Sequence, residues 1–208
     1  MLPRPSRDEL RRRMPRLMWG LVLFGVGLAF MVESNLGLGP WEVFHQGISN
    51  NTGIPIGTVG IFVGFAVLLG WIPLKERLGV GTLLNVVIIG IVIDLTIWVM
   101  PTPETELVKW IALISGLLLN GLASGLYIGA GLGPGPRDGL MTGIARRGYP
   151  VGVVRFGLEV AVLALGWLLG GTVGIGTVLY AFGIGPLVHV FLDLFSLEPI
   201  PEAASSSP

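Results

Sequence analysis

The stretch SNLGLGPWEVFHQG, residues 34–47, interrupts an apolar helix with two glycines and a proline, then restarts with Trp41 and Glu42. Glycine tolerates unusual backbone angles, and proline suits the first position of a helix. The stretch therefore predicts a break followed by a short helix at about 40–50. A second stretch, GAGLGPGPRDGLMTG at 129–143, predicts another short helix at about 136–146. The residues that form the two breaks are Gly37, Gly39, Pro40, Gly131, Gly133 and Pro134.

The sequence around these breaks has the composition of a membrane protein. Of its 208 residues, 52% are hydrophobic and only 12% are charged, about half the charged share of an average soluble domain. Several apolar runs are long enough to cross a bilayer, which takes roughly 20 residues in a helix. We expect an all-α polytopic membrane protein with six spans, at about 17–36, 55–73, 79–99, 108–130, 151–170 and 174–196. The chain has no cysteine, which excludes disulfides and thiolate metal sites.

The basic residues predict the orientation of these spans, because cytoplasmic loops carry an excess of Lys and Arg. With the N-terminus in the cytoplasm, eleven of the thirteen basic residues fall inside. We therefore place both termini in the cytoplasm. The expected organisation is a basic cytoplasmic segment at 1–16, a single membrane domain at 17–200 and a disordered tail at 201–208. The inside residues are Arg4, Arg7, Arg11, Arg12, Arg13, Arg16, Lys75, Arg77, Arg137, Arg146 and Arg147.

The two breaks belong to an internal repeat with an offset of about 95 residues. Glu42 corresponds to Asp138, and the motif GVGT at 79–82 corresponds to GIGT at 174–177. We assign the first repeat to 17–100 and the second to 108–196. Each repeat holds three spans, and an odd number of spans inverts the second copy relative to the first. Inverted repeats with broken helices recur in secondary transporters.

The motifs NLGLGPWEVFHQGIS and LYIGAGLGPGPRDGLMTG, together with GIPIGT, resemble the YczE-like branch of the YczE/YyaS/YitT family of bacterial integral membrane proteins. The resemblance covers roughly residues 17–195. It implies a small multi-pass protein of the bacterial inner membrane and an association with production of peptide antibiotics. It carries over no substrate and no catalytic residues.

Three charged residues lie in the first turns of the expected short helices. Glu42 and Asp138 either complement the helix dipoles or line a solute site at helix N-termini that enter the membrane. Arg137 opposes its helix dipole. It is expected to pair with Asp138 or Glu159, to bind lipid phosphate or an anionic solute, or to act as a headgroup residue of the cytoplasmic side.

Other ionisable residues fall within the spans. Arg155 and Glu159 are four apart and therefore share a helix face; they form either a structural ion pair or part of a pathway, because charge inside a bilayer is costly. Asp94 and His189 occupy matching positions in the two repeats; they either relay protons or are solvated near an interface. His45 is expected to be a solvated loop residue. Asn120 and Tyr127 precede the second break and could satisfy freed backbone groups or contact a solute.

The leading functional interpretation is a small secondary transporter or permease for a small polar solute that the sequence does not identify. The alternative is a membrane interaction protein, a homo-oligomer or the partner of another membrane protein, that assists a biosynthetic or export complex. No nucleophile–base arrangement or metal-ligand motif is visible, so we predict no enzymatic activity, cofactor or metal. The basic residues follow membrane topology, which argues for contact with the lipid bilayer and against binding to nucleic acid.

Overall fold

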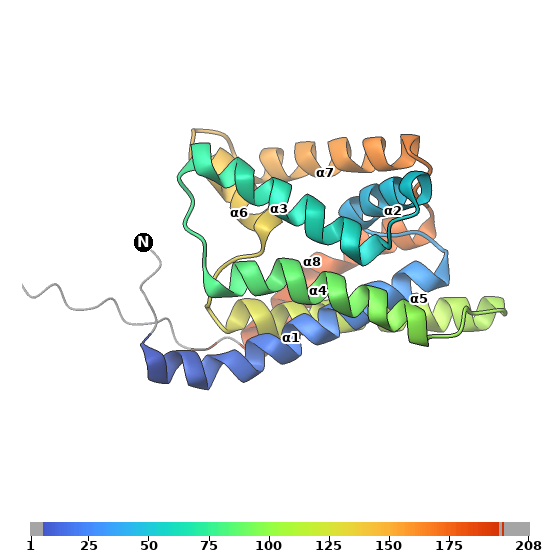
Figure 1. Ribbon diagram of the computed structural model, residues 1–208, viewed down its shortest axis with the longest axis horizontal. Helices are drawn as coiled ribbons and strands as arrows, with labels where there is room; N and C mark the ends of the chain where they lie inside the picture. Colours follow the sequence, from blue (N-terminus) through green and yellow to red (C-terminus); the bar gives the residue numbers. More distant parts are fainter. Residues whose placement is uncertain (1–5, 196, 198–208) are drawn as a thin grey trace, which may run out of the picture.

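The computed structural model describes residues 6–195 and 197, and this part of the chain folds into helices without strands. The predicted tail at 201–208 lies outside the described residues, as do residues 1–5 of the basic segment. Figure 1 shows the helices arranged as a bundle. They are α1 (Arg7–Ser34), α2 (Pro40–Thr52), α3 (Ile56–Leu74), α4 (Val80–Val99), α5 (Glu106–Gly129), α6 (Pro136–Ala145), α7 (Val151–Leu168) and α8 (Ile175–Phe195).

The predicted six spans and two short helices are confirmed. Six helices (α1, α3, α4, α5, α7 and α8) are long and apolar enough to cross a membrane. The short helices α2 and α6 start at Pro40 and Pro136, each in the first position after a glycine N-cap. The chain is therefore a multi-pass helical membrane protein in which the Gly-Pro stretches separate long helices from short ones.

Helix α1 begins ten residues before the predicted first span. A capping box explains the early start, because Ser6 accepts from the Glu9 N–H while the Glu9 carboxylate accepts from the Ser6 N–H. The 28-residue helix is about 42 Å long, against about 30 Å for a hydrocarbon core. Its basic first turns therefore extend beyond the apolar part. Arg13 is buried there and donates to the Ala130 carbonyl at 3.1 Å, which fixes the loop after α5.

The two break loops are each held by a helix from the other half of the chain. The Gly81 N–H donates to the Leu132 carbonyl at 3.0 Å, and the Gly176 N–H donates to the Leu36 carbonyl at 2.8 Å. The next residue of each loop has a positive φ, +128° at Gly133 and +115° at Gly37, which favours glycine. The GVGT motif of the first half is thus hydrogen-bonded to the GLG motif of the second half, and the GIGT motif of the second half to the GLG motif of the first.

The halves also interlock through their helices. α1 packs along α5, α2 packs against α7, and α6 packs against α3. In Figure 1, α2 lies at one end of the molecule and α6 lies toward the opposite end. Both halves follow the order long, short, long, long. This order agrees with a duplicated unit, while the inversion of the second copy stays a prediction from the odd number of spans.

The halves differ at one helix pair. α3 and α4 pack closely, and a Cβ built on Gly57 would collide with the carbonyl oxygen of Gly90. Under the 95-residue offset, the counterparts of these glycines are Gly152 in α7 and Gly185 in α8. A Cβ built on either one meets nothing within 4 Å. α7 and α8 make no extensive contact with each other, so the second half is open where the first half is closed.

Candidate functional site: a charged cavity between two short helices

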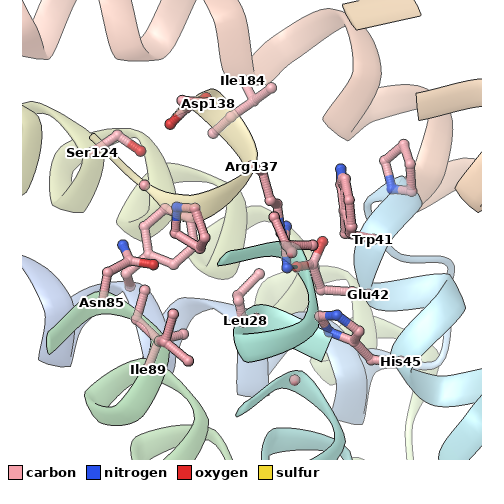
Figure 2. Close-up of a pocket in the computed structure, with 18 of the residues that line it drawn as sticks. Leu28, Trp41, Glu42, His45, Asn85, Ile89, Ser124, Arg137, Asp138 and Ile184 are labelled. Atoms are coloured by element: carbon pink, nitrogen blue, oxygen red, sulfur yellow. Dashed lines mark ion pairs between the residues drawn. The ribbon is translucent and has the colours of Figure 1, made fainter. Parts of the chain in front are cut away.

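A cavity of about 400 Å³ lies where the N-termini of α2 and α6 meet. Its volume falls within the range of small-molecule sites, about 300–1,000 Å³. Long helices from both halves complete the wall with mainly apolar side chains, of which Figure 2 labels Leu28, Ile89 and Ile184. The wall includes Arg155 and Glu159 of α7 and Tyr180 of α8, so the cavity reaches the side on which α7 and α8 separate.

The two break motifs meet in this cavity through an ion pair. Arg137 Nη2 of α6 lies 2.7 Å from Glu42 Oε1 of α2. The Arg137 guanidinium also lies over the ring of Trp41, 5.1 Å from its centroid. Figure 2 shows the Arg137 side chain reaching toward Glu42 with Trp41 and His45 nearby. The Glu42 side chain is 3% exposed and the Arg137 side chain 29% exposed, so the pair is shielded from water on its Glu42 side. Glu42 compensates the Arg137 charge, which otherwise opposes the α6 dipole.

Pairing with Asp138 or Glu159 was one of the roles that the sequence left open for Arg137, and the structure contradicts it, since the ion pair goes to Glu42. The physical reason is that Arg137 and Asp138 are neighbours in one helical turn and point in different directions. Side chains that face each other along a helix are three or four residues apart. Glu42 belongs to the other repeat, 95 positions earlier in the chain, and only the packing of the two halves brings it to Arg137.

Asp138 is the third charged residue at the helix N-termini. Its Oδ2 accepts a long hydrogen bond of 3.5 Å from the Tyr127 hydroxyl. Among the described residues Asp138 forms no ion pair. Burial raises the pKa of this carboxyl, and the charges of Arg155 and Arg137 oppose that rise. Asp138 is therefore the cavity carboxylate with the weakest compensation.

His45 and Trp41 contribute buried nitrogen atoms to the cavity wall. His45 is 4% exposed and Trp41 6% exposed, and neither His45 Nε2 nor Trp41 Nε1 has a hydrogen-bond partner among the described residues. Burial, helped by the charge of Arg137, lowers the pKa of His45 to about 3 against an opposing effect of Glu42. The imidazole is therefore neutral at pH 7. The expectation of a solvated His45 is wrong, because α2 is covered by α3 and α7.

Arg155 and Glu159 form the ion pair expected from their spacing, with Arg155 Nε 3.0 Å from Glu159 Oε1. Both side chains line the cavity on the α7 side and remain partly exposed, 56% and 33%. The predicted contact is thus confirmed. The pair lies at the gap between α7 and α8 rather than in the centre of the bundle.

Asp94 and His189 lie outside the cavity wall. The Asp94 carboxylate accepts from the N–H groups of Gly57 and Thr58 at 2.6 and 2.8 Å and from the Thr58 hydroxyl at 2.7 Å. These bonds satisfy the free donors at the start of α3, so they support a capping role. His189 lies 3.7 Å from Asp193 on the exposed side of α8. The structure does not bring Asp94 and His189 together.

Three further polar residues of the cavity wall were not singled out from the sequence: Asn85 of α4, Ser124 of α5 and Tyr180 of α8. Each is a polar side chain within a strongly apolar helix, and that isolation is the signal that could have found them. Tyr127, which was singled out, lines the cavity, whereas Asn120 is fully buried beside Met31.

A bundle of six apolar helices around a charged cavity defines this chain as a multi-pass membrane protein with an internal site. The sequence matches the DUF6198 family, described as a family of unknown function, over residues 11–193, and the chain belongs to that family.

The relatives fit the resemblance found in the sequence. An uncharacterized protein of Haemophilus influenzae is 43% identical over 184 residues, covering 88% of this chain and 84% of the relative. The uncharacterized membrane protein YczE of Bacillus subtilis is 35% identical, covering 89% and 88%, respectively. The uncharacterized protein YyaS of the same species is 27% identical, covering 84% and 90%. No solved structure matches the chain.

Proposed function

We propose that the protein is a secondary transporter of a small polar solute in the bacterial inner membrane, with both termini in the cytoplasm. The observation that carries the proposal is the 2.7 Å ion pair between Glu42 and Arg137. The predicted topology places the loop before α2 on the outer side and the loop before α6 on the inner side. Two residues that follow loops on opposite sides can touch only if the loops re-enter the membrane.

Re-entrant loops of this kind are tolerated at membrane depth only where they are buried in protein or line a cavity. Here both short helices direct their N-termini at one cavity, as in transporters built from inverted repeats. The cavity supplies charged groups, buried hydrogen-bonding nitrogens and an apolar wall. These are the features that a site for a small polar molecule requires.

The open side between α7 and α8 provides a route into the cavity. The closed pair α3 and α4 blocks the corresponding route in the first half. Transport follows if α7 moves toward α8 while α3 moves away from α4, so that the cavity opens to one side at a time. Gly152 and Gly185 leave the space that this closure needs.

The direct test is solute-driven charge movement in proteoliposomes, recorded by solid-supported membrane electrophysiology against amines, amino acids and organic acids. We expect a saturable current with at least one class of solute, abolished in Glu42→Gln. The matched control is Glu106→Gln, which removes an exposed carboxylate paired with Lys109 outside the cavity. Equal currents in Glu42→Gln and the control, or no current or tracer flux with any solute class from folded protein, would contradict transport through this cavity.

The second candidate function is a membrane interaction protein that supports a biosynthetic or export complex. The observation in its favour is the bare surface of α7 and α8, on which Phe156, Trp167 and Phe182 are 71%, 65% and 79% exposed. Lipid covers such a surface equally well. Cross-linking in native membranes followed by mass spectrometry distinguishes a stable protein partner on this surface from lipid alone.

A further inference from the structure

The charges inside the cavity do not cancel. Its wall carries five charged side chains, of which two pairs neutralise each other: Glu42 with Arg137, and Glu159 with Arg155. Asp138 is the fifth, and no basic side chain of the described residues lies within ion-pair distance of it. With His45 neutral and Asp138 ionised, the described residues of the wall give the cavity a formal charge of −1.

The groups around Asp138 form a polar corner at Gly135. A Cβ built on Gly135 lies 3.1 Å from Asp138 Oδ2, 3.4 Å from the Tyr127 hydroxyl and 3.9 Å from Asn85 Nδ2. The 3.5 Å contact between Tyr127 and Asp138 is too long to satisfy a carboxylate. Asp138 is partly buried, and a carboxylate that loses part of its hydration is stabilised by a cationic partner.

The positive groups of the cavity are already engaged. Arg137 holds Glu42 and lies over Trp41, and Arg155 holds Glu159. An anionic ligand would compete with Glu42 or Glu159 for these guanidinium groups and would meet Asp138 as a like charge. A cation meets the opposite situation, because its donors find the acceptor oxygens of Asp138, and no basic side chain of the described residues lies within ion-pair distance of them.

Apart from Ser124, much of the remaining wall near this corner is apolar. Phe24 packs edge-on against Tyr127, with ring centroids 5.9 Å apart, and Leu28 and Ile89 line the same cavity. In Figure 2, Asn85 lies apart from the Glu42–Arg137 pair, with Leu28 between them. An inorganic cation leaves this hydrocarbon surface without a partner, whereas an amine with an apolar body covers it.

We propose that the cavity binds a small organic cation, a protonated amine with a compact apolar body, whose ammonium group pairs with Asp138 beside Tyr127 and Asn85. The proposal rests on the proposed function, since it names the solute class of the same cavity. It assigns the Glu42–Arg137 pair to holding the two short helices together and Asp138 to contact with the solute.

The test is binding of cyclohexylammonium chloride to the purified full chain in detergent at pH 7, measured by thermal unfolding and by isothermal titration calorimetry. Cyclohexanol and cyclohexanecarboxylate serve as the neutral and anionic probes of the same shape. We expect saturable stabilisation by the ammonium compound and little or none by the other two probes. A preference for the carboxylate, or equal effects of all three, would overturn the proposal.

Two substitutions locate the site. Asp138→Asn should weaken binding of the ammonium probe by about tenfold or more, because a charge-assisted hydrogen bond is lost, whereas Glu106→Gln should leave it unchanged. Asp138→Glu keeps the negative charge and should retain binding of the ammonium probe. It serves as the test variant if Asp138→Asn does not fold. Unchanged affinity in folded Asp138→Asn, or loss of binding in folded Asp138→Glu equal to that in the amide variant, would contradict the assignment to Asp138.

Binding and flux measurements together distinguish a failure of the ammonium site from a failure of transport. Saturable binding that needs Asp138, without flux of any amine in proteoliposomes, supports the ammonium site and contradicts transport. Flux of a solute that is not an amine, unchanged in Asp138→Asn, supports transport and overturns the site.

Discussion

Arg137 illustrates how a single residue can be unfavourable in its own helix and favourable in the molecule. In the first turn of α6 it opposes the helix dipole. Glu42 forms an ion pair with Arg137 from the first turn of α2, where a negative charge also stabilises its own helix. The residues at the start of the two short helices therefore stabilise one another across the repeat, and neither can be understood from its own half.

This pairing predicts a strong effect of Glu42→Gln on stability. The change leaves the Arg137 guanidinium, which is 29% exposed, without its counter-charge. The cost should lie between about 1 kcal/mol for an exposed pair and about 3 kcal/mol for a fully buried one. We expect a lower thermal midpoint in detergent. Glu106→Gln, which disrupts an exposed pair, should change stability by about 0.5 kcal/mol or less. Equal midpoints for the two variants would show that the Glu42–Arg137 pair does not hold the short helices together.

A second prediction concerns Asp94. If it caps α3, Asp94→Ala should lower the free energy of unfolding by about 1–2 kcal/mol, as for other N-cap losses. Binding of the ammonium probe should be unchanged, because Asp94 lies outside the cavity wall. Calorimetric titration of the folded variant measures this. A stable variant with altered proton coupling in proteoliposomes would instead support the proton relay considered from the sequence.

At the level of helices, the glycines of α3 and α7 allow a matched comparison. Gly57→Ala places a methyl group against the carbonyl oxygen of Gly90 and should cost about 1–3 kcal/mol through overpacking. Gly152→Ala at the corresponding place in α7 meets nothing within 4 Å. It should be neutral or stabilise by up to about 1 kcal/mol, since alanine favours a helix over glycine. Thermal unfolding of both variants checks the difference, and equal losses would contradict the open arrangement of α7 and α8.

The helices are also the level at which the sequence is most informative. Hydropathy and the Gly-Pro breaks are local signals. They predicted the six spans and the starts of α2 and α6 at Pro40 and Pro136. The Glu42–Arg137 pair depends on how two distant segments meet, and local spacing carries no information on that. His45 was placed wrongly for the same reason, because only the covering helices decide that a polar short helix is buried.

At the level of the whole molecule, the gap between α7 and α8 predicts a movement. The chain has no cysteine, so a pair introduced as Gly152→Cys and Gly185→Cys can be cross-linked without interference. We expect an intramolecular disulfide in membranes, because closure of α7 onto α8 should bring the two Cα atoms to within about 7 Å, the distance that a disulfide requires. Non-reducing electrophoresis after mild oxidation detects the product.

The single-cysteine variants are the controls for this experiment, since they can form only disulfides between molecules. Transport should stop in the cross-linked protein and return on reduction. If both thiols react with a maleimide and no intramolecular disulfide forms under any condition, α7 does not close onto α8 and the proposed gating is wrong.

The interlocked contacts of the two halves also bear on how the protein is made. While the ribosome synthesises the first half, α1 lacks α5, α2 lacks α7 and α3 lacks α6. The early helices therefore lack these packing partners, and Glu42 lacks Arg137, until the later helices are inserted into the bilayer. A fragment that ends after α4 is expected to be degraded by membrane proteases, and co-expression of the missing half should rescue it.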